Sequence, residues 1–495
     1  MKALDELCSV ALSSPSGQPA IEFEKKWITW GELKRLADQV TQLIDASGAG
    51  AHVKVAFVAR NRPSAIAAFL GLLAEGCSVR MVYPFQSTQA LAYELERIKP
   101  AIVVADAGDY AEVILQTLKT TGSAAIALDG MNASACAGLE MTRHTQDNPG
   151  PPCIEILTSG TTGPPKPFSL RYDMIARHIV GSKDLPAQIS VEDTAAPPAL
   201  LMFPVSNISG LYSTLPPLLK GQRVLLLERF TVAGWHDHIL RYRPPASGLP
   251  PAGVQMVLDA DIPVEDLSCL KAMGTGAAPL DPAIKHAFEE RYGVPILLSY
   301  GATEFGGPVT RMTPELQDTF GGKKDGSVGL ALPGVKLRVI DPDSEAELPA
   351  ESEGVLEVVA PRIGTHWIRT SDLVRIDDDG FLFILGRLDG AIIRGGFKLL
   401  PATIEHALLK HPDISAVAVL GIPDRRVGQV PVAAIELRPG ATAPTAVQVE
   451  AHLRNHVPAT HIPVAWHFTD ALPRTPSMKV DQPAVRRLFE DPALK

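Results

Sequence analysis

Apolar and polar residues alternate along the first two thirds of the chain in blocks that predict strands and helices in turn. Short apolar runs such as VKVAFVAR (53–60) and PAIVVAD (100–106) are typical of buried strands. Between them, PSAIAAFLGLLAEG (63–76) has the length and composition of a helix that ends at a glycine. The strand pattern returns at RVLLLER (223–229) and VPILLSYG (294–301). This alternation predicts a doubly wound α/β region.

The pattern changes twice in the last third of the chain. Three strand-like runs follow one another without a helix between them, so we expect antiparallel pairing. The runs are GVKLRVID (334–341), GVLEVVA (354–360) and GFLFILGR (380–387). Beyond them, helix-like TIEHALLKH (403–411) is followed by strand-like ISAVAVLGIPD (414–424), which indicates a small α+β domain. We therefore predict one domain over residues 1–386 and another over 387–495, with the boundary near Asp389.

Composition narrows the class of protein. The 495 residues carry a formal net charge of −9, which argues against a broad surface for nucleic acid or anionic membrane. The five cysteines lack metal-ligand spacing, so we expect reduced thiols in a reducing compartment. The N-terminus has no long signal-peptide core, and the most apolar stretch, Ala65 to Val79, is shorter than the roughly 20 residues that span a bilayer. A cytoplasmic protein without a transmembrane segment is expected.

The stretch EILTSGTTGPPKPFSL (155–170) carries the first candidate chemistry. Hydroxyls, glycines and a lysine follow an apolar run, an arrangement typical of a loop that grips phosphate. A Walker loop needs its lysine directly after the second glycine, but two prolines separate Gly163 from Lys166. We therefore predict a different phosphate loop, in which hydroxyls and amides surround the phosphate and Lys166 closes over it. For TSGTTG alone, a polar surface loop is the alternative.

A set of motifs in one order along the chain resembles the adenylate-forming superfamily of acyl-CoA synthetases, luciferases and peptide-synthetase adenylation domains. LTSGTTGPPK resembles its phosphate loop and SYGATE (299–304) its aromatic-Gly-x-Thr-Glu motif. GTGAAPL (274–280) resembles the adenine-side loop, and IRTSDL (368–373) the Thr-Gly-Asp motif. The hinge with its thiolation loop and the catalytic-lysine region are matched by GRLDGAIIRGG (386–396) and PRTPSMKVDQ (473–482). The resemblance covers the chain from about Trp30 to Val485.

The resemblance implies a fold and a reaction. The fold would be a large N-terminal AMP-binding domain of doubly wound mixed sheets with a small β-subdomain, followed by a small, mobile α+β lid. The reaction would use ATP, Mg²⁺ and CoA: a carboxylate attacks the α-phosphate, pyrophosphate leaves, and the CoA thiol then takes the acyl group from acyl-AMP. Asp389 would be the hinge about which the lid rotates, presenting Gly395 and Gly396 to the pantetheine of CoA.

The resemblance also assigns the nucleotide site. Tyr300 would stack on adenine, Asp372 would take the ribose hydroxyls, and Arg387 would support the ribose or the domain junction. Glu304 would help to hold Mg²⁺, a cation that takes carboxylates and phosphate oxygens, and Lys479 would stabilise the attack on the α-phosphate. The catalytic set is Lys166, Thr303, Glu304 and Lys479. The set for ATP and AMP is Thr158, Ser159, Gly160, Thr161, Thr162, Gly163, Lys166, Gly276, Ala277, Tyr300, Gly301, Thr303, Asp372 and Arg387.

The segment FPVSNISGL (203–211) borders the acid in the resemblance. The superfamily often has His where Asn207 stands; Asn cannot carry a positive charge, although its amide can still donate a hydrogen bond. No acidic residue that would pair an amino group occurs between Phe203 and Gly210, so a neutral fatty, alicyclic or aryl acid is favoured. The pocket candidates are Phe203, Asn207, Ile208, Gly210, Pro251, Gly274, Ala277, Tyr300 and Gly306. Core packing is the alternative for the apolar ones.

Further departures keep other functions open. Ser371 and Met478 stand where the superfamily usually has Gly, and Gly390 where a second acidic residue is common. An acid–CoA ligase is the leading prediction, with a small carboxylic acid as partner. The alternatives are an adenylating enzyme that loads a carrier-protein phosphopantetheine, which the lack of a carrier domain after Lys495 disfavours, and a nucleotide-binding scaffold that has lost catalysis. A homo-oligomer stays open.

Overall fold

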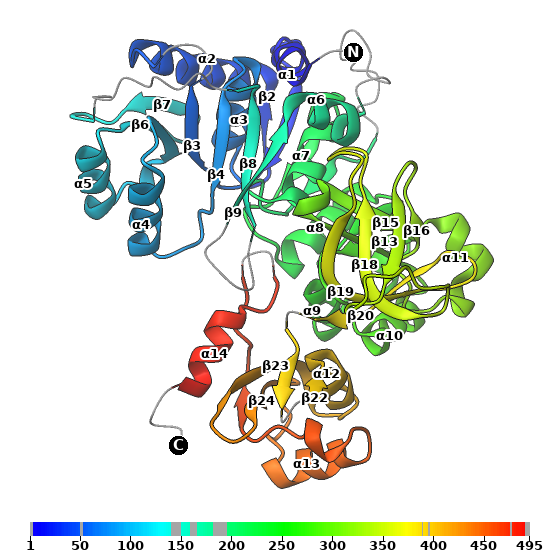
Figure 1. The fold of residues 1–495 in the computed structure, drawn as a ribbon. Coiled ribbons are helices and arrows are strands. Elements are labelled where there is room, and N and C mark those ends of the chain that lie inside the picture. The colour runs from blue at the N-terminus through cyan, green and yellow to red at the C-terminus, as the bar shows by residue number, and fades with distance from the viewer. Residues whose placement is uncertain are drawn as a thin grey trace. The chain divides into compact units, whose positions relative to one another are not determined.

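The structure is a computed structural model (Figure 1). It describes residues 3–49, 53–139, 150–158, 166–181, 196–388, 390–394, 397–475 and 478–490. The chain forms two compact units, and each is described by itself. One contains residues 1–244 with 302–307, and the other contains 245–301 with 308–495. No helix among the described residues is long and apolar enough to cross a membrane. The predicted boundary residue, Asp389, lies outside the described residues, so the division at 386 stays a prediction.

A seven-stranded mixed sheet is the centre of the first unit. Its strand order is β7-β6-β5-β3-β4-β8-β9. The five inner strands run parallel, whereas β7 and β9 are antiparallel edge strands. The strands are β3 (Lys54–Val58), β4 (Ser78–Val82), β5 (Ile102–Asp106), β6 (Ala124–Asp129), β7 (Asn132–Ala135), β8 (Cys153–Thr158) and β9 (Lys166–Arg171).

Both faces of this sheet are covered by helices, as the alternation along the sequence predicted. Along β3, Val55 and Phe57 pack into the core shared with α2 and α3, whereas Ala56 and Val58 pack into the core shared with α4 and α5. Successive side chains of a strand point to opposite faces, so both faces are buried. Figure 1 shows these helices around the sheet. They are α1 (Leu4–Leu12), α2 (Trp30–Ala46), α3 (Pro63–Ala74), α4 (Thr88–Ile98) and α5 (Glu112–Thr121).

A four-stranded mixed sheet completes the first unit. Its order is β10-β11-β1-β2, with β1 parallel to β11 and antiparallel to β2. Thr29 caps α2 with its side chain and forms a capping box with Glu32, which fixes where the hairpin ends and the helix begins. The elements are β1 (Pro19–Phe23), β2 (Lys26–Thr29), α6 (Tyr172–Met174), β10 (Ala199–Leu201), α7 (Ile208–Leu219), β11 (Val224–Leu226) and α8 (Val232–Tyr242).

The second unit contains a five-stranded sheet of order β12-β13-β14-β15-β16. The strands are β12 (Ala246–Gly248), β13 (Ala272–Gly276), β14 (Ile296–Ala302), β15 (Gly307–Arg311) and β16 (Leu330–Ala331). Strands β12, β13 and β14 are parallel, and β15 pairs antiparallel with β16. The helices are α9 (Pro251–Asp259), α10 (Pro282–Tyr292) and α11 (Pro314–Phe320).

The predicted antiparallel strands form a sheet of their own, with one strand more than expected. The order is β17-β18-β19-β20, all antiparallel. The extra strand, β19, contains the motif IRTSDL and separates two of the predicted strands. The bounds are β17 (Lys336–Ile340), β18 (Glu353–Val359), β19 (Ile368–Ile376) and β20 (Leu382–Arg387). The polar residues at 369–372 interrupt the apolar pattern, so the periodicity did not predict this strand.

The C-terminal part has the predicted α+β composition. Strands β23 and β24 form a long antiparallel hairpin, to which β25 adds in parallel. Apolar residues of this hairpin, including Val419 and Ile435, form a core with α12 and α13. The elements are β21 (Ile392–Arg394), β22 (Phe397–Leu399), α12 (Pro401–Leu409), β23 (Ile414–Asp424), β24 (Gly428–Leu437), α13 (Ala446–Arg454), β25 (Trp466–Thr469) and α14 (Gln482–Glu490).

Candidate active site

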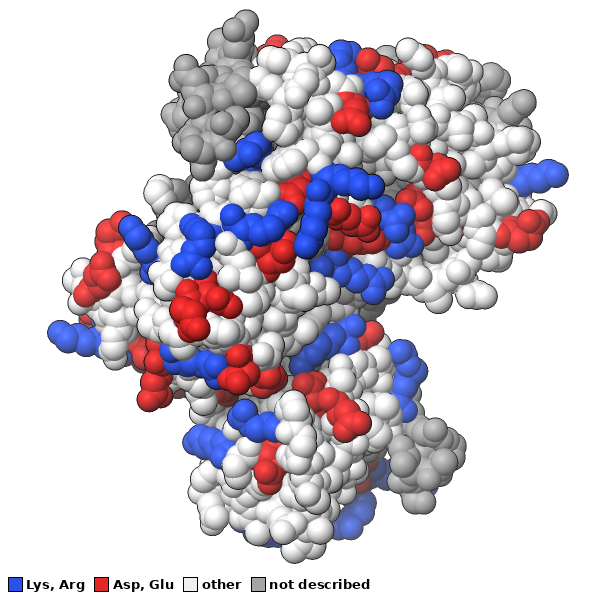
Figure 2. Space-filling model, turned by 180° about the vertical axis from the view of Figure 1, so that it is seen from behind, with Lys and Arg blue, Asp and Glu red and all other residues white. Residues whose placement is uncertain are grey.

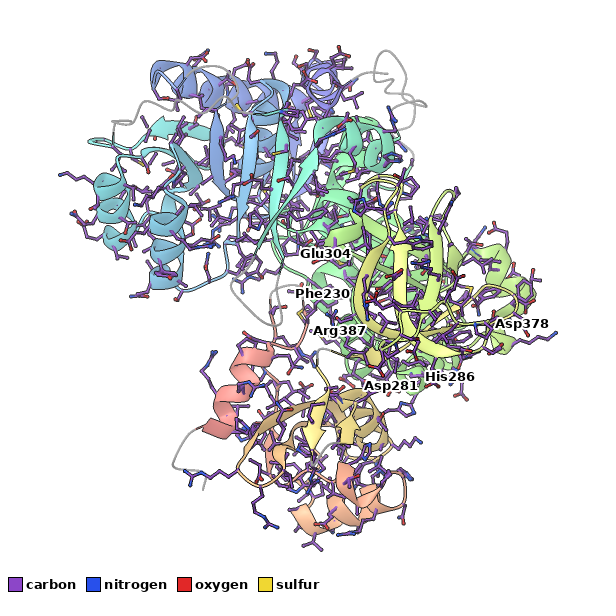
Figure 3. All side chains as sticks on the ribbon, viewed as in Figure 1. Phe230, Asp281, His286, Glu304, Asp378 and Arg387 are labelled. Carbon is purple, nitrogen blue, oxygen red and sulfur yellow. The ribbon has the colours of Figure 1, made fainter. Side chains whose placement is uncertain are left out.

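Three residues that the sequence assigned to the nucleotide meet in the second unit. Tyr300, near the end of β14, donates its hydroxyl hydrogen bond to Oδ2 of Asp372 on β19. Arg387, the last residue of β20, places Nη1 3.4 Å from Oδ1 of the same carboxylate; Figure 3 labels this arginine. Asp372 is only 8% exposed, so its charge is held in a largely desolvated position by a phenol and a guanidinium.

Strand pairing explains why Asp372 and Arg387 meet. The two residues stand directly opposite each other in the antiparallel pair of β19 and β20, where side chains on one face lie close together. Ser371, the departure that precedes Asp372, accepts a hydrogen bond of 2.6 Å from Nη2 of Arg387. The Ser371 carbonyl oxygen accepts another, of 2.7 Å, from the backbone N–H of Leu388. A glycine at position 371 would lack the first of these contacts.

The adenine-side loop begins where β13 ends. Gly276 stands opposite Ser299 of β14, and a Cβ at position 276 would lie 2.4 Å from Oγ and 2.8 Å from the carbonyl oxygen of Ser299. A side chain is therefore excluded there, and the two backbones approach closely. Ala277 follows with φ of 69°, a left-handed conformation that is uncommon for a residue with a Cβ. Gly276, Ala277 and Tyr300 thus lie at the carboxyl edge of parallel strands, where α/β folds bind ligands.

The predicted phosphate loop connects two paired strands of the first unit. β8 ends at Thr158 and β9 begins at Lys166, and these residues are opposite each other in the antiparallel register. A strand therefore follows the loop where a Walker loop would be followed by a helix. Ser159, Gly160, Thr161, Thr162 and Gly163 lie outside the described residues, and the side chains of Thr158 and Lys166 are not described, so their roles stay predictions.

The Thr303-Glu304 turn lies beside β8. Thr303 begins the short helix η4 (Thr303–Phe305), which contacts β8 within the first unit. The carboxylate of Glu304, labelled in Figure 3, is exposed. Among the described residues, no group of three or more His, Cys, Asp and Glu side chains could hold a metal ion. A single carboxylate such as Glu304 is enough for Mg²⁺ in a nucleotide site, because phosphate oxygens and water supply most of the ligands of this cation.

The predicted acid-pocket segment is held by its own backbone and by a helix cap. Asn207 is the N-cap of α7, and its Oδ1 accepts a hydrogen bond of 2.7 Å from the N–H of Gly210. A Cβ at Gly210 would lie 1.8 Å from the carbonyl oxygen of Pro204, so this glycine allows the segment to fold back on the helix. Phe203 and Ile208 are partly exposed. Gly274 belongs to the other unit.

A tyrosine that the sequence did not single out contacts the end of the Glu304 turn. Gly307, with φ of 123°, follows Gly306, and a Cβ on Gly307 would lie 2.0 Å from Cε2 of Tyr212 on α7. The ring of Tyr212 therefore packs directly on this backbone. Tyr212 lies five residues after Asn207, on the helix that Asn207 caps, so the sequence places it near the predicted acid pocket. Its contact with Gly307, 95 positions away, has no signal in the sequence.

The catalytic-lysine candidate lies in a tight turn of the C-terminal part. The carbonyl oxygen of Lys479 accepts a hydrogen bond of 2.6 Å from the N–H of Thr475, and its own N–H donates to Oγ1 of Thr475 at 3.2 Å. Met478 has φ of 62°, which explains why a glycine is usual before this lysine. Lys479 is exposed. Asp389, Gly395 and Gly396 lie outside the described residues, so the hinge and CoA assignments stay predictions.

The fold is that of an α/β protein, and Tyr300, Asp372 and Arg387 meet at the carboxyl edge of its parallel strands, where α/β folds bind ligands. The chain belongs to the AMP-binding enzyme family: residues 9–364 match the family model "AMP-binding enzyme", and residues 403–479 match "AMP-binding enzyme C-terminal domain". The superfamily resemblance predicted from the motifs is therefore confirmed.

Individual relatives and a solved structure agree with this family. The chain is 29% identical to an indoleacetate–CoA ligase of Aromatoleum aromaticum, over 95% of both chains. It is 28% identical to a 4-coumarate–CoA ligase-like protein of Oryza sativa subsp. japonica, over 86% of this chain and 80% of that protein. ATP-bound MatB from Rhodopseudomonas palustris shares the fold, with a TM-score of 0.81, 24% identity and 99% coverage of both chains. The predicted fold class is thereby confirmed.

Proposed function

We propose that this protein is an ATP-dependent, AMP-forming acid–CoA ligase. It activates a neutral carboxylic acid as acyl-AMP, releases pyrophosphate and transfers the acyl group to CoA. The observation that carries the proposal is the carboxylate of Asp372, held between Tyr300 and Arg387 at the carboxyl edge of β14, where a nucleotide ribose would bind. The names of the relatives support the acid–CoA ligase class, and that class is the one that the sequence predicted.

The residues of this chain divide the work of the first step. Asp372 accepts hydrogen bonds from the ribose hydroxyls, and Gly276 and Ala277 pack near the adenine, which stacks on Tyr300. The segment from Thr158 to Lys166 would hold the β- and γ-phosphates, while Thr303 would bond a phosphate oxygen. Glu304 would hold Mg²⁺ together with phosphate oxygens, and the cation would supply positive charge that stabilises the leaving pyrophosphate. Catalysis of this kind is mainly positioning and electrostatic stabilisation of the attack by the acid.

Lys479 completes the site in the adenylation state, when the residues after Asp389 form a lid over the nucleotide. Its ammonium group stabilises the charge that gathers as the acid approaches the α-phosphate. Two hydrogen bonds with Thr475 fix the backbone of Lys479. Only the aliphatic side chain of Lys479 therefore loses conformational freedom when the site closes. After rotation about Asp389, Gly395 and Gly396 leave space for pantetheine.

A neutral acid is the proposed substrate class. The proposed acid-pocket segment carries no ionisable side chain from Phe203 to Gly210, and the ring of Tyr212, on the helix that follows, packs on the backbone of Gly307. Basic and acidic side chains are interspersed on the face seen in Figure 2, which does not favour a polyanion as partner. Location and oligomeric state stay predictions from the sequence.

The direct test is pyrophosphate release with Mg-ATP and a panel of acids, each with and without CoA. The panel is hexanoate, cyclohexanecarboxylate and phenylacetate. We expect release in multiple turnovers only when CoA is added, together with formation of the acyl-CoA. Release that is indifferent to CoA but responds to a phosphopantetheinylated carrier protein would identify another acceptor. ATP binding without any release would favour a scaffold.

A variant separates the two half-reactions. Lys479→Ala should lower adenylation by about 10²-fold or more, the usual effect of removing one group that stabilises transition-state charge. The same variant should convert supplied acyl-AMP and CoA to acyl-CoA at close to the normal rate. Lys410→Ala, which removes another exposed lysine of the C-terminal part, is the matched control. Equal losses in both half-reactions would remove Lys479 from this role.

A further inference from the structure

Asn61 is a buried amide that the proposed mechanism does not use. It lies between β3 and α3 and is only 2% exposed. Its Nδ2 donates hydrogen bonds to the carbonyl oxygens of Phe203, at 3.0 Å, and Leu227, at 3.3 Å. Its Oδ1 accepts a hydrogen bond of 3.0 Å from the N–H of Val205. All three partners are backbone groups far away in the sequence. The side chain thus satisfies backbone groups that no neighbouring strand or helix pairs with.

The partners of Asn61 place it between the two sheets of the first unit. Phe203 and Val205 follow β10, and Leu227 follows β11, both in the four-stranded sheet, whereas Asn61 follows β3 of the seven-stranded sheet. One side chain therefore fixes the carboxyl edges of both sheets relative to each other. Loops at such edges carry ligand-binding residues in α/β folds.

Ion pairs on either side hold Asn61 in place. Arg60 forms an ion pair with Asp109. Arg62 pairs with Asp106, at 2.7 Å, and with Glu228, at 3.1 Å. Glu228 is the residue after Leu227, so Arg62 and Asn61 bind adjacent positions of the same loop. The backbone that carries the amide is thus anchored independently of the segment that the amide holds.

The segment that Asn61 holds is the predicted acid pocket. Two hydrogen bonds from Asn61 reach Phe203 and Val205, and the cap at Asn207 begins two residues later. Between these fixed points, the carbonyl group of Pro204 also packs closely against Gly210. Loss of the amide would therefore free residues 203–205 while leaving α7 and its cap in place. A shift of this backbone by a fraction of an ångström would change the proposed pocket but not the contacts of Asp372 with Tyr300 and Arg387, which belong to the other unit.

We propose that Asn61 is a positioning residue for acid binding, which sets the backbone of residues 203–205 against which the acid packs. Because the acid pocket belongs to the proposed function, the role of Asn61 rests on that function. It acts through the backbone, without touching the substrate.

The first test separates the affinities for the two substrates. In Asn61→Ala, the KM for the acid should rise about tenfold or more, while the KM for ATP stays within about twofold, since a displaced pocket loses binding of the acid alone. The assay is pyrophosphate release with whichever of hexanoate, cyclohexanecarboxylate and phenylacetate the unmodified protein uses. Equal increases in both KM values, or no increase in either, would overturn the positioning role.

Tyr110→Phe is the matched control. The hydroxyl of Tyr110 also lies within hydrogen-bond distance of two backbone carbonyl oxygens, those of Val103 at 3.0 Å and Ile126 at 2.9 Å, and shares its one hydrogen between them, but it does so between β5 and β6 rather than at the acid pocket. It should lower the thermal stability in the same direction as Asn61→Ala and leave both KM values within about twofold. A rise in the KM for the acid in this control would show that general loosening, and not Asn61, sets acid affinity.

A second variant keeps the proposal testable if Asn61→Ala does not fold. Asn61→Asp preserves the shape, and its neutral carboxyl can still donate to Phe203, whereas the ionised form presents oxygen to two carbonyls. Burial raises the pKa of such a carboxyl. The ratio of the variant's KM for the acid to that of the unmodified protein should therefore rise with pH between 6 and 8. A flat ratio, with pyrophosphate release intact, overturns the role of Asn61; no release from the unmodified protein with any acid overturns the proposed function itself.

Discussion

The hydroxyl of Tyr300 donates a hydrogen bond to the carboxylate of Asp372, a residue 72 positions further along the chain. The other carboxylate oxygen faces Arg387 at 3.4 Å. The two oxygens are therefore oriented before any ligand arrives, and a ribose would meet a carboxylate whose direction is already set. Such preorganisation lowers the entropy that binding has to overcome.

Tyr300→Phe tests that orientation. The ring stays, so the proposed stacking on adenine is retained, but the hydrogen bond to Asp372 is lost. We expect the KM for ATP to rise about three- to tenfold, close to the roughly 1 kcal/mol of a typical net hydrogen bond, with the KM for the acid unchanged. The matched control is Tyr292→Phe, which removes a 3.2 Å bond to the Ile262 carbonyl elsewhere in the second unit. A similar rise in the control would speak against a special role for Tyr300.

The Ser371 hydroxyl should be coupled to Arg387. Ser371→Ala removes the acceptor of the 2.6 Å bond, and because Arg387 is half exposed we expect a weakening of ATP binding of only about two- to fivefold. Repeated in an Arg387→Ala background, the same change should have no further effect. Calorimetric titration with ATP in the four proteins of this double-mutant cycle measures the coupling. Additive effects would show that the hydroxyl acts independently of the arginine.

Ser206 should be replaceable by alanine without loss of stability. Its hydroxyl is buried, with the residue 6% exposed, and has no hydrogen-bond partner among the described residues. A buried, unpaired hydroxyl is unfavourable, so Ser206→Ala should leave the free energy of unfolding unchanged or raise it by up to about 1 kcal/mol. Denaturant titration measures this. Stability that is preserved together with a higher KM for the acid would instead assign the hydroxyl to the substrate.

The stability of the C-terminal part should depend on Glu405. Burial raises the pKa of this carboxyl to about 7, although Oε1 accepts a 2.8 Å bond from the N–H of Val419. A raised folded pKa means that its contribution is fully present below the unfolded pKa of about 4.3 and is lost as pH rises through 7. Glu405→Gln keeps the acceptor and cannot ionise.

The measurement for Glu405 is chemical denaturation of both proteins at several pH values. As pH rises from about 4.5 to 7, the unmodified protein should lose stability relative to Glu405→Gln. The free energy of unfolding of the variant minus that of the unmodified protein should therefore increase over this range and stay constant above it. Parallel curves across this range would contradict a raised pKa at position 405.

The sequence predicted the sheets better than the contacts between them. Runs such as residues 53–60 revealed buried strands because both faces of β3 are apolar, and the motifs located Tyr300, Asp372 and Arg387. The strand β19 was missed because Arg369, Thr370, Ser371 and Asp372 break its apolar pattern, although β19 pairs with β18 on one side and β20 on the other. Contacts that span long separations, such as those of Asn61 with residues 203 and 227, have no signature in local periodicity. They follow from the packing of whole sheets.

One irregularity in the β19–β20 pair determines which charge Asp372 meets. Val374 pairs with Ile384, but Leu373 pairs with Gly386, so Leu385 is an extra residue that bulges from the ladder. If the regular pairing continued past Val374, Gly386 would stand opposite Asp372 and Arg387 opposite Ser371. The bulge thus shifts the register of β20 against β19 by one residue. A change in the hairpin that restored even spacing would separate Arg387 from Asp372, although every residue of the proposed nucleotide site would remain in the sequence.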